Sequence, residues 1–147
     1  DMTTLGLPQW FVWASASAVF AALTAIFAKL GLKNIDSDSA TFIRTLIILV
    51  ALACFLSYTG KWQNPSNLSA QNWIFLVLSG LATGASWLAY FKALQLGNAS
   101  QVAPVDKFSV VLVTLFAVVF LAERPSVREW LGIGLISLGV LTLAWRR

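Results

Sequence analysis

Long apolar runs alternate with short polar stretches along the chain. A helix of about 20 predominantly apolar residues is long enough to cross the hydrocarbon core of a bilayer. Five runs come close to that length or exceed it, and they predict membrane-spanning helices over residues 10–30, 40–58, 73–96, 102–124 and 130–145. Tryptophans at or near four of the segment ends fit the aromatic belts of bilayer interfaces. Because five is an odd number, the two ends of the chain are expected on opposite sides of the membrane.

The composition places the chain among integral membrane proteins. It has 147 residues, of which 59% are apolar and 11% charged, and its mean hydropathy is +0.79. A chain of this size cannot bury so much apolar surface in its own core. We therefore expect a single all-α domain over residues 1–147, surrounded by membrane lipid. The connections are short except for the polar loop 59–72, in which Ser69 is expected to cap the third helix.

The residue content argues against several function classes. The net charge is +4, but Lys and Arg mark segment ends and form no basic run, so no nucleic-acid partner is expected. There is no histidine, and the single cysteine, Cys54, cannot form an intrachain disulfide. With six acids and one thiol, neither a metal site nor a catalytic triad is expected. We predict no cofactor, no metal and no enzymatic activity.

The fourth apolar run begins with polar residues. Pro104, Asp106 and Lys107 stand where the apolar sequence should already have begun, and residues 108–122 are then apolar or hydroxyl-bearing throughout. We expect one spanning helix that carries charge near one end. Ionisable residues inside a span are rare and usually functional. The alternative is that Asp106 and Lys107 lie outside the membrane, paired with each other or with water.

Three cations and one anion are predicted toward the same side of the membrane: Arg44, Lys92, Asp106 and Lys107. At about 1.5 Å rise per residue, Arg44 and Lys107 lie about 6–9 Å from the bilayer midplane, and Lys92 is shallower. This cluster predicts a substrate site or gate for an anionic or zwitterionic group, formed by Arg44, Lys107 and Asp106. The alternative is that the long side chains reach the lipid headgroups and only anchor the helices.

The third run carries a second group of candidate residues. Gly80, Gly84, Trp87 and Phe91 recur at helical spacing, and hydroxyl-bearing and aromatic side chains adjoin them. Such groups suit an amphipathic solute in a water-accessible cavity. The side chains predicted to line that cavity are Trp87, Tyr90, Ser86 and Thr83.

Glycines in two runs predict helix packing. Gly80 and Gly84 form a GxxxG pair, which more often permits close helix contact than it marks a ligand site. Gly132 and Gly139 are interpreted in the same way, as part of a contact face on the last helix.

The stretch ALQLGNASQVAPVDKFSVVLVTLFAVVFLAERPSVREWLGIGLISLGVLTL resembles the end of an EamA domain of the drug/metabolite transporter superfamily. In that family a spanning helix ends in Glu-Arg, a short loop follows, and a glycine-bearing last helix completes the unit. Here these elements are Glu123-Arg124, residues 125–129 and residues 132–139, and the similarity extends back to about residue 10. Similar proteins move metabolites, amino acids or drugs across bacterial inner membranes. The resemblance thus implies a multi-pass transporter of small molecules in the bacterial inner (plasma) membrane.

Most members of that family have ten helices, built from two five-helix repeats of opposite orientation, whereas this chain has one repeat. Inverted repeats bind substrate near the midplane, at the repeat interface. The resemblance therefore implies half of a ten-helix transporter, working by alternating access as an antiparallel homodimer. Pairing with a related half-size chain is the fallback. The rival interpretation is a non-transporting scaffold subunit that packs against another membrane protein through its glycines.

Basic residues at the membrane boundaries favour neither orientation strongly. Short loops rich in Lys and Arg stay in the cytoplasm. Four such residues are on the side of the C-terminus and three on the other side: Lys29, Lys33, Arg146 and Arg147, against Lys61, Arg124 and Arg128. Adding the three cations predicted inside the spans makes seven against three, which moves the C-terminus toward the cytoplasm. The count is compatible with both orientations of the chain, and it favours the one with the C-terminus in the cytoplasm.

Overall fold

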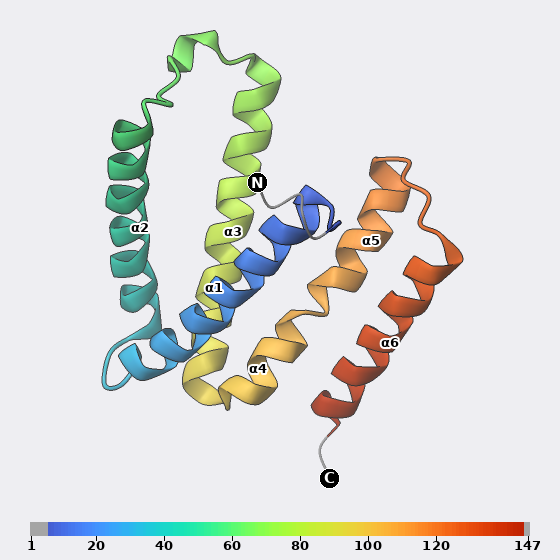
Figure 1. Cartoon of the computed structure of the whole chain (residues 1–147). Helices are drawn as coiled ribbons and strands as arrows, with labels where there is room; N and C mark the ends of the chain where they lie inside the picture. The colour runs from blue at the N-terminus through green and yellow to red at the C-terminus, as the bar shows by residue number, and fades with distance from the viewer. Residues whose placement is uncertain (1–5, 146–147) are drawn as a thin grey trace. The chain divides into compact units, whose positions relative to one another are not determined.

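The computed structural model describes residues 6–145, and all regular structure among them is helical (Figure 1). Five spans are long and apolar enough to cross a membrane, which confirms the predicted all-α membrane fold. The elements are α1 (Gln9–Gly31), α2 (Ser37–Thr59), the 3₁₀ turn η2 (Pro65–Asn67), α3 (Ala70–Leu96), α4 (Ala99–Asp106), α5 (Ser109–Phe120) and α6 (Val127–Ala144). Arg146 and Arg147, which enter the predicted charge count, lie outside the described residues.

Three helices begin about one turn before the apolar runs that predict them, because capping residues stand upstream of those runs. The carboxylate of Asp36 accepts a hydrogen bond from the backbone N–H of Ser39 (3.0 Å) at the start of α2. The hydroxyl of Ser69 accepts one from the backbone N–H of Asn72 (3.1 Å), which confirms the predicted cap of α3. Ser126 forms a reciprocal capping box at the start of α6.

The fourth span is not one continuous helix, and this corrects the prediction. It consists of α4 and α5, which are interrupted at Lys107 and Phe108. Pro104 removes one backbone donor from α4. Immediately after it the backbone tightens to 3₁₀-type hydrogen bonds, from Lys107 to Pro104 (3.1 Å) and from Phe108 to Val105 (3.0 Å). The polar residues that looked out of place in the sequence therefore stand at an interruption inside the span.

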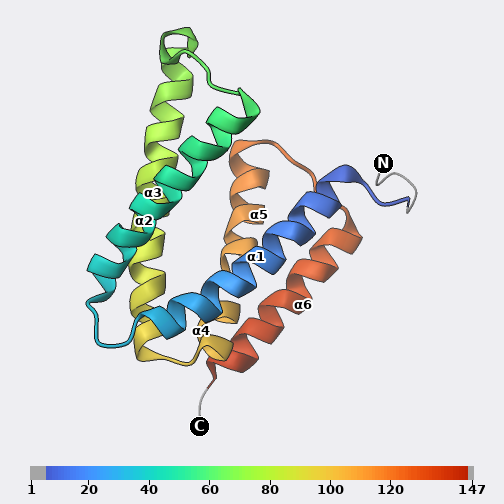
Figure 2. The ribbon, with the colours of Figure 1, turned by 60° about the vertical axis from the view of Figure 1, so that its left-hand side comes forward.

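The chain divides into two compact units, which we describe separately. The α2–α3 unit covers Ile26–Leu96 and contains the end of α1 with α2 and α3. The α4–α6 unit joins the residues up to Ala25 with those from Gly97 onward. Within the first unit α2 and α3 pack together, joined at one end by the loop with η2 (Figure 1). Within the second, α6 packs against α4 and α5 (Figure 2).

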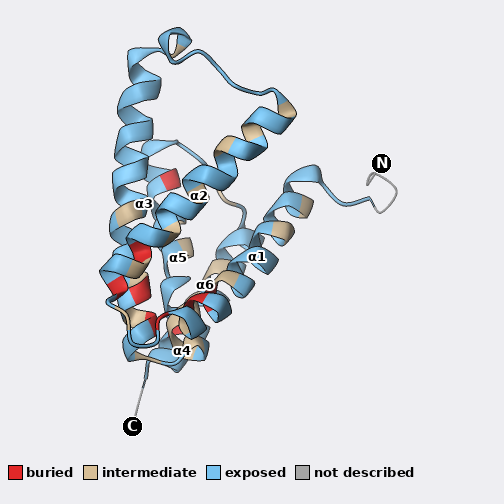
Figure 3. Cartoon of the chain, turned by 90° about the vertical axis from the view of Figure 1, so that its left-hand side faces the viewer, coloured by how far each residue is buried: buried red, intermediate tan, exposed pale blue. Residues whose placement is uncertain are grey.

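One end of the α2–α3 unit is held together by side-chain bonds to backbone carbonyls. The Gln95 amide donates to the carbonyls of Leu32 (3.2 Å) and Ile35 (2.7 Å), just before α2 begins. The ammonium group of Lys29 donates to the carbonyl of Leu94. The buried residues of this unit gather near the same end (Figure 3). These contacts fix the end of α3 beside the start of α2.

Replacing Gln95 by leucine is expected to lower the free energy of unfolding by about 0.5–1.5 kcal/mol, because two partly exposed carbonyls lose their donor. Thermal unfolding of the purified protein in detergent measures the effect. Gln71→Leu is the matched control, because Gln71 is exposed on the same helix. If both variants melt at the same temperature, the Gln95 bonds contribute nothing to stability.

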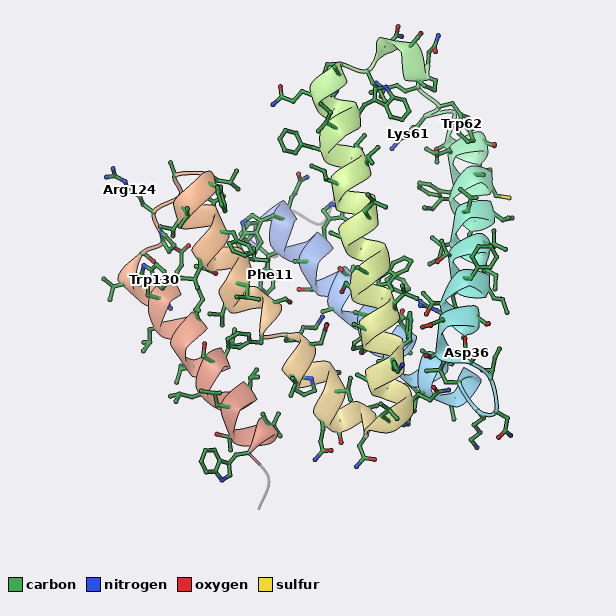
Figure 4. All side chains as sticks on the ribbon, turned by 180° about the vertical axis from the view of Figure 1, so that it is seen from behind. Phe11, Asp36, Lys61, Trp62, Arg124 and Trp130 are labelled. Atoms are coloured by element: carbon green, nitrogen blue, oxygen red, sulfur yellow. The ribbon has the colours of Figure 1, made fainter. Side chains whose placement is uncertain are left out.

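Most apolar side chains of the spans are exposed. Only seven apolar residues among those described are buried: Ala25, Ala28, Leu32, Phe91, Leu94, Ala117 and Val140. Polar groups mark the helix ends, with Asp36 at one end of α2 and Lys61 and Trp62 at the other (Figure 4). Helices with this distribution need lipid or another protein chain around them.

Candidate functional site

Arg44 lies on the face of α2 that packs against α3, seven residues beyond the start of the helix at Ser37. Its guanidinium carbon lies over the ring of Phe91, 4.0 Å from the ring centroid. The ring of Trp87 is on the same side, with its centroid 5.7 Å away. Both rings belong to α3, so a cation of one helix is held by two aromatic side chains of its neighbour.

The guanidinium stays deep in the span. At about 1.5 Å rise per residue, Arg44 is about 10 Å from the start of α2, while Phe91 and Trp87 are about 8 and 14 Å from the end of α3. Those two helix ends are level with each other, because Gln95 bonds to the backbone just before α2. Arg44 therefore lies at a depth between those of the two rings. This argues against the alternative in which Arg44 extends to the lipid headgroups.

One nitrogen of Arg44, Nη1, is buried and has no hydrogen-bond partner within the described part of the chain. The two carboxylates of the α2–α3 unit, Asp36 and Asp38, are exposed at the start of α2, and Asp36 caps that helix. A cation–π contact contributes about 0.5–2 kcal/mol. Removing a charge from water costs several kcal/mol unless a counter-ion compensates. The two rings therefore offset only part of the cost, and Arg44 lacks an acceptor in its own unit.

The glycine stripe of α3 leaves open space on the same helix face. Leu94 and Phe91 are buried, Trp87 and Gly84 are half-buried, and Gly80 is exposed. A Cβ atom placed on Gly80 or Gly84 would meet no heavy atom of the described chain within 4 Å. The same is true of Gly132 and Gly139 in α6. These four glycines do not mark helix contacts within the described chain, and packing against another chain stays a prediction for them.

The remaining predicted residues of α3 lie beside the Arg44 contact. Tyr90 is half-buried, and its ring meets the Phe91 ring edge-on, with centroids 5.6 Å apart. Thr83 is exposed, and its hydroxyl donates to the carbonyl of Ser79 on its own helix (2.8 Å). Ser86 is exposed. The structure thus places Trp87 directly beside Arg44, joins Tyr90 to Arg44 through Phe91, and leaves Thr83 and Ser86 toward the surface of α3.

Asp106 and Lys107 stand at the α4–α5 interruption and are exposed. No ion pair joins them to each other among the described residues of their unit. They belong to the α4–α6 unit, whereas Arg44 belongs to the α2–α3 unit. The predicted cluster of Arg44, Lys107 and Asp106 therefore stays a prediction.

Phe91 is the main site residue that the sequence predictions did not name as a ligand contact. It was assigned to the small and aromatic stripe of the third run, whereas in the structure it is the ring closest to Arg44. The signal was its position four residues after Trp87, which puts both rings on one face of α3. That spacing does not show which residue of α2 lies opposite the two rings, and in the structure it is Arg44.

The fold and this site define a multi-pass membrane protein with a cation held inside a span. A profile of the EamA-like transporter family matches residues 8–145. The chain belongs to this family. No solved structure matches it.

Three curated relatives illustrate the likeness. The chain is 56% identical over 136 residues to a protein of Sinorhizobium sp. named as an uncharacterized transporter in the cobO 3′ region, covering 92% of this chain and 96% of the relative. It is 29% identical to the uncharacterized transporter YxxF of Bacillus subtilis, covering 92% of this chain but only 43% of that protein. It is also 29% identical to a probable 4-amino-4-deoxy-L-arabinose-phosphoundecaprenol flippase subunit, ArnE, of Yersinia pestis, covering 69% of this chain and 90% of the relative.

Proposed function

We propose that the protein transports small organic solutes across the bacterial inner membrane by alternating access. The observation that carries this proposal is Arg44, a cation kept inside a span by two aromatic rings in a chain of a transporter family. Charged side chains inside spans are costly, and they mark substrate or ion pathways more often than they stabilise a fold. The solute path is lined by Trp87, Tyr90, Ser86 and Thr83, together with Arg44, Lys107 and Asp106.

The working unit in this proposal is a pair of five-span units in opposite orientation. The Sinorhizobium relative is covered over 96% of its length, so that protein also holds one such unit. The Bacillus relative is covered over 43%, which leaves room for a second unit in one chain. The open glycine faces of α3 and α6 supply surfaces on which a second copy can pack. The Yersinia relative is named a subunit, which favours the fallback of a related half-size partner.

The proposal is tested by uptake into liposomes that contain the purified protein. A panel of metabolites, amino acids and drugs is first screened for solutes that raise the melting temperature of the protein in detergent. Solutes that do so are then offered to the liposomes in labelled form. Accumulation above that of protein-free liposomes supports transport. A solute that stabilises the protein but never crosses the membrane supports the scaffold interpretation instead.

Asp106→Asn is expected to slow transport about tenfold or more, equivalent to about 1.4 kcal/mol, without lowering the melting temperature. An interrupted backbone with ionisable side chains is tolerated at membrane depth only where it faces protein or water. The exposed Asp106 has no ion pair among the described residues that its loss would break. Asp38→Asn is the control, because Asp38 is exposed near the start of α2.

Both variants are compared in liposome uptake and in thermal unfolding. Equal uptake by Asp106→Asn, Lys107→Gln and the original protein would show that the α4–α5 interruption is not part of the solute path. A large fall in the melting temperature of Asp106→Asn alone would assign the carboxylate a structural role.

A further inference from the structure

Arg44 combines three properties that a structural cation rarely combines. It is held at depth by Phe91 and Trp87, one of its nitrogens is buried without an acceptor, and no carboxylate of its unit lies beside it. A guanidinium group carries five N–H donors and no acceptor, so only an acceptor can satisfy it. Carboxylate and phosphate oxygens match its planar fork best.

Within the α2–α3 unit, the charge around Arg44 fits a ligand with one oxyanion. The other cations in the helices of this unit are Lys29, at the end of α1, and Lys92, on α3. Lys29 donates to the carbonyl of Leu94, and Lys92 is exposed, whereas Phe91 beside it is buried. Neither is placed to share an anion with Arg44. A single guanidinium group suits one carboxylate or one phosphate rather than a polyanion.

The surroundings of Arg44 limit the rest of the ligand. The half-buried ring of Trp87 and the open space at Gly84 and Gly80 continue from Arg44 along the same face of α3. The face formed by these three residues is apolar and small, and the hydroxyl groups of Thr83 and Ser86 lie beside it on α3. Because the two rings already hold the guanidinium in place, less of its side-chain entropy is lost when it binds an anion.

We propose that Arg44 binds the single carboxylate or phosphate of an amphipathic substrate, whose apolar part lies along Trp87, Gly84 and Gly80. This inference rests on the proposed transport function and names the substrate class. In the ligand-free protein Arg44 is then a cation kept without its partner, and the substrate supplies that partner.

The first test needs no knowledge of the ligand. If Arg44 lacks a partner in the resting protein, Arg44→Met removes an uncompensated charge, so the melting temperature in neutral detergent stays equal or rises. A clearly lower melting temperature of Arg44→Met would show that a protein group already satisfies the guanidinium, and this would overturn the inference. Lys61→Met is the control, because Lys61 is an exposed cation in the loop that follows α2.

The second test uses defined probes. Benzoate and phenyl phosphate carry one oxyanion on an apolar ring, and benzamide is the uncharged comparison. Both anions are expected to raise the melting temperature of the original protein and of Lys61→Met in a saturable way, whereas benzamide has no effect. Arg44→Gln should weaken the apparent affinity about tenfold or more, and Arg44→Lys should retain part of it. Absence of a shift with benzoate, with phenyl phosphate and with lysophosphatidate alike, or an equal shift in Arg44→Gln, overturns the inference.

Lysophosphatidate in the same neutral micelles distinguishes a lipid headgroup from a soluble substrate. An Arg44-dependent shift with lysophosphatidate alone keeps the oxyanion site and assigns its occupant to a lipid. Shifts with benzoate or phenyl phosphate assign it to a soluble amphipathic anion. Failure of liposome uptake would overturn the proposed transport function but leave these binding shifts intact. Uptake that is unchanged in Arg44→Gln would overturn only the proposal that Arg44 binds the substrate.

Discussion

Replacing Trp87 by alanine is expected to abolish transport while most of the protein remains folded. The Trp87 ring lies 5.7 Å from the guanidinium carbon of Arg44 and borders the open space at Gly84. Its loss removes one wall of the proposed site and one of the two rings that hold Arg44. Truncating a fully buried tryptophan costs about 3–5 kcal/mol, and a half-buried one costs less because part of its surface is not packed.

Liposome uptake and the yield of monodisperse protein in detergent measure the two effects separately. Trp13→Ala is the matched control, because Trp13 is an exposed tryptophan near the start of α1. Trp87→Phe should retain part of the transport rate, since it keeps an aromatic ring beside Arg44. Normal uptake by Trp87→Ala would remove α3 from the solute path. Phe91→Ala is less informative, because Phe91 is only 2% exposed and its loss would also damage packing.

The five spans could be predicted because apolar length is a local property of the sequence. The helix starts were less accurate, since the first turns of α2, α3 and α6 are polar and lie before the apolar runs. The Ser69 cap was predicted because an N-cap requires only a short polar side chain at the right position. Local rules therefore described the spans and their ends well.

The interruption between α4 and α5 was not predicted, although its signal was present. Pro104 and the charged pair after it were noted, but the apolar length of residues 108–122 favoured one continuous helix. Whether a proline bends, tightens or ends a helix depends on the hydrogen bonds available around it. Here the bonds from Lys107 and Phe108 shorten to the 3₁₀ type, and periodicity carries no information on that choice.

The site could be predicted only in parts. Arg44 was grouped with Lys107 and Asp106 by depth, and Trp87 was grouped with its neighbours on α3 by helical spacing. Spacing assigns residues to a face of one helix, but it does not say which helices pack together or at which level. The contact of Arg44 with Phe91 depends on the alignment of α2 with α3. Gln95 holds that alignment through bonds to residues about 60 positions earlier in the chain.

Reporters fused in turn to the C-terminus are expected to give comparable signals on both sides of the membrane. One reporter is active only in the cytoplasm and the other only in the periplasm, so together they distinguish the two orientations. The prediction follows from the near balance of boundary cations, with four on the side of the C-terminus and three on the other. Signal from the cytoplasmic reporter alone, in cells that lack a partner chain and still transport, would contradict an antiparallel homodimer.

Charge-shifted variants test whether the two orientations must occur together. Lys61→Gln with Arg128→Gln leaves four boundary cations on the side of the C-terminus and one on the other side. This should fix the C-terminus in the cytoplasm. Gln63→Lys with Ser66→Lys changes the exposed α2–α3 loop and, combined with Arg146→Gln and Arg147→Gln, gives two boundary cations on the side of the C-terminus against five on the other, which should favour the opposite insertion. Each variant alone is expected to lose most transport, because an inverted partner is scarce. Producing the two together should restore it, since each supplies the orientation that the other lacks. Full transport by the first double variant alone would show that the inverted copy is not needed.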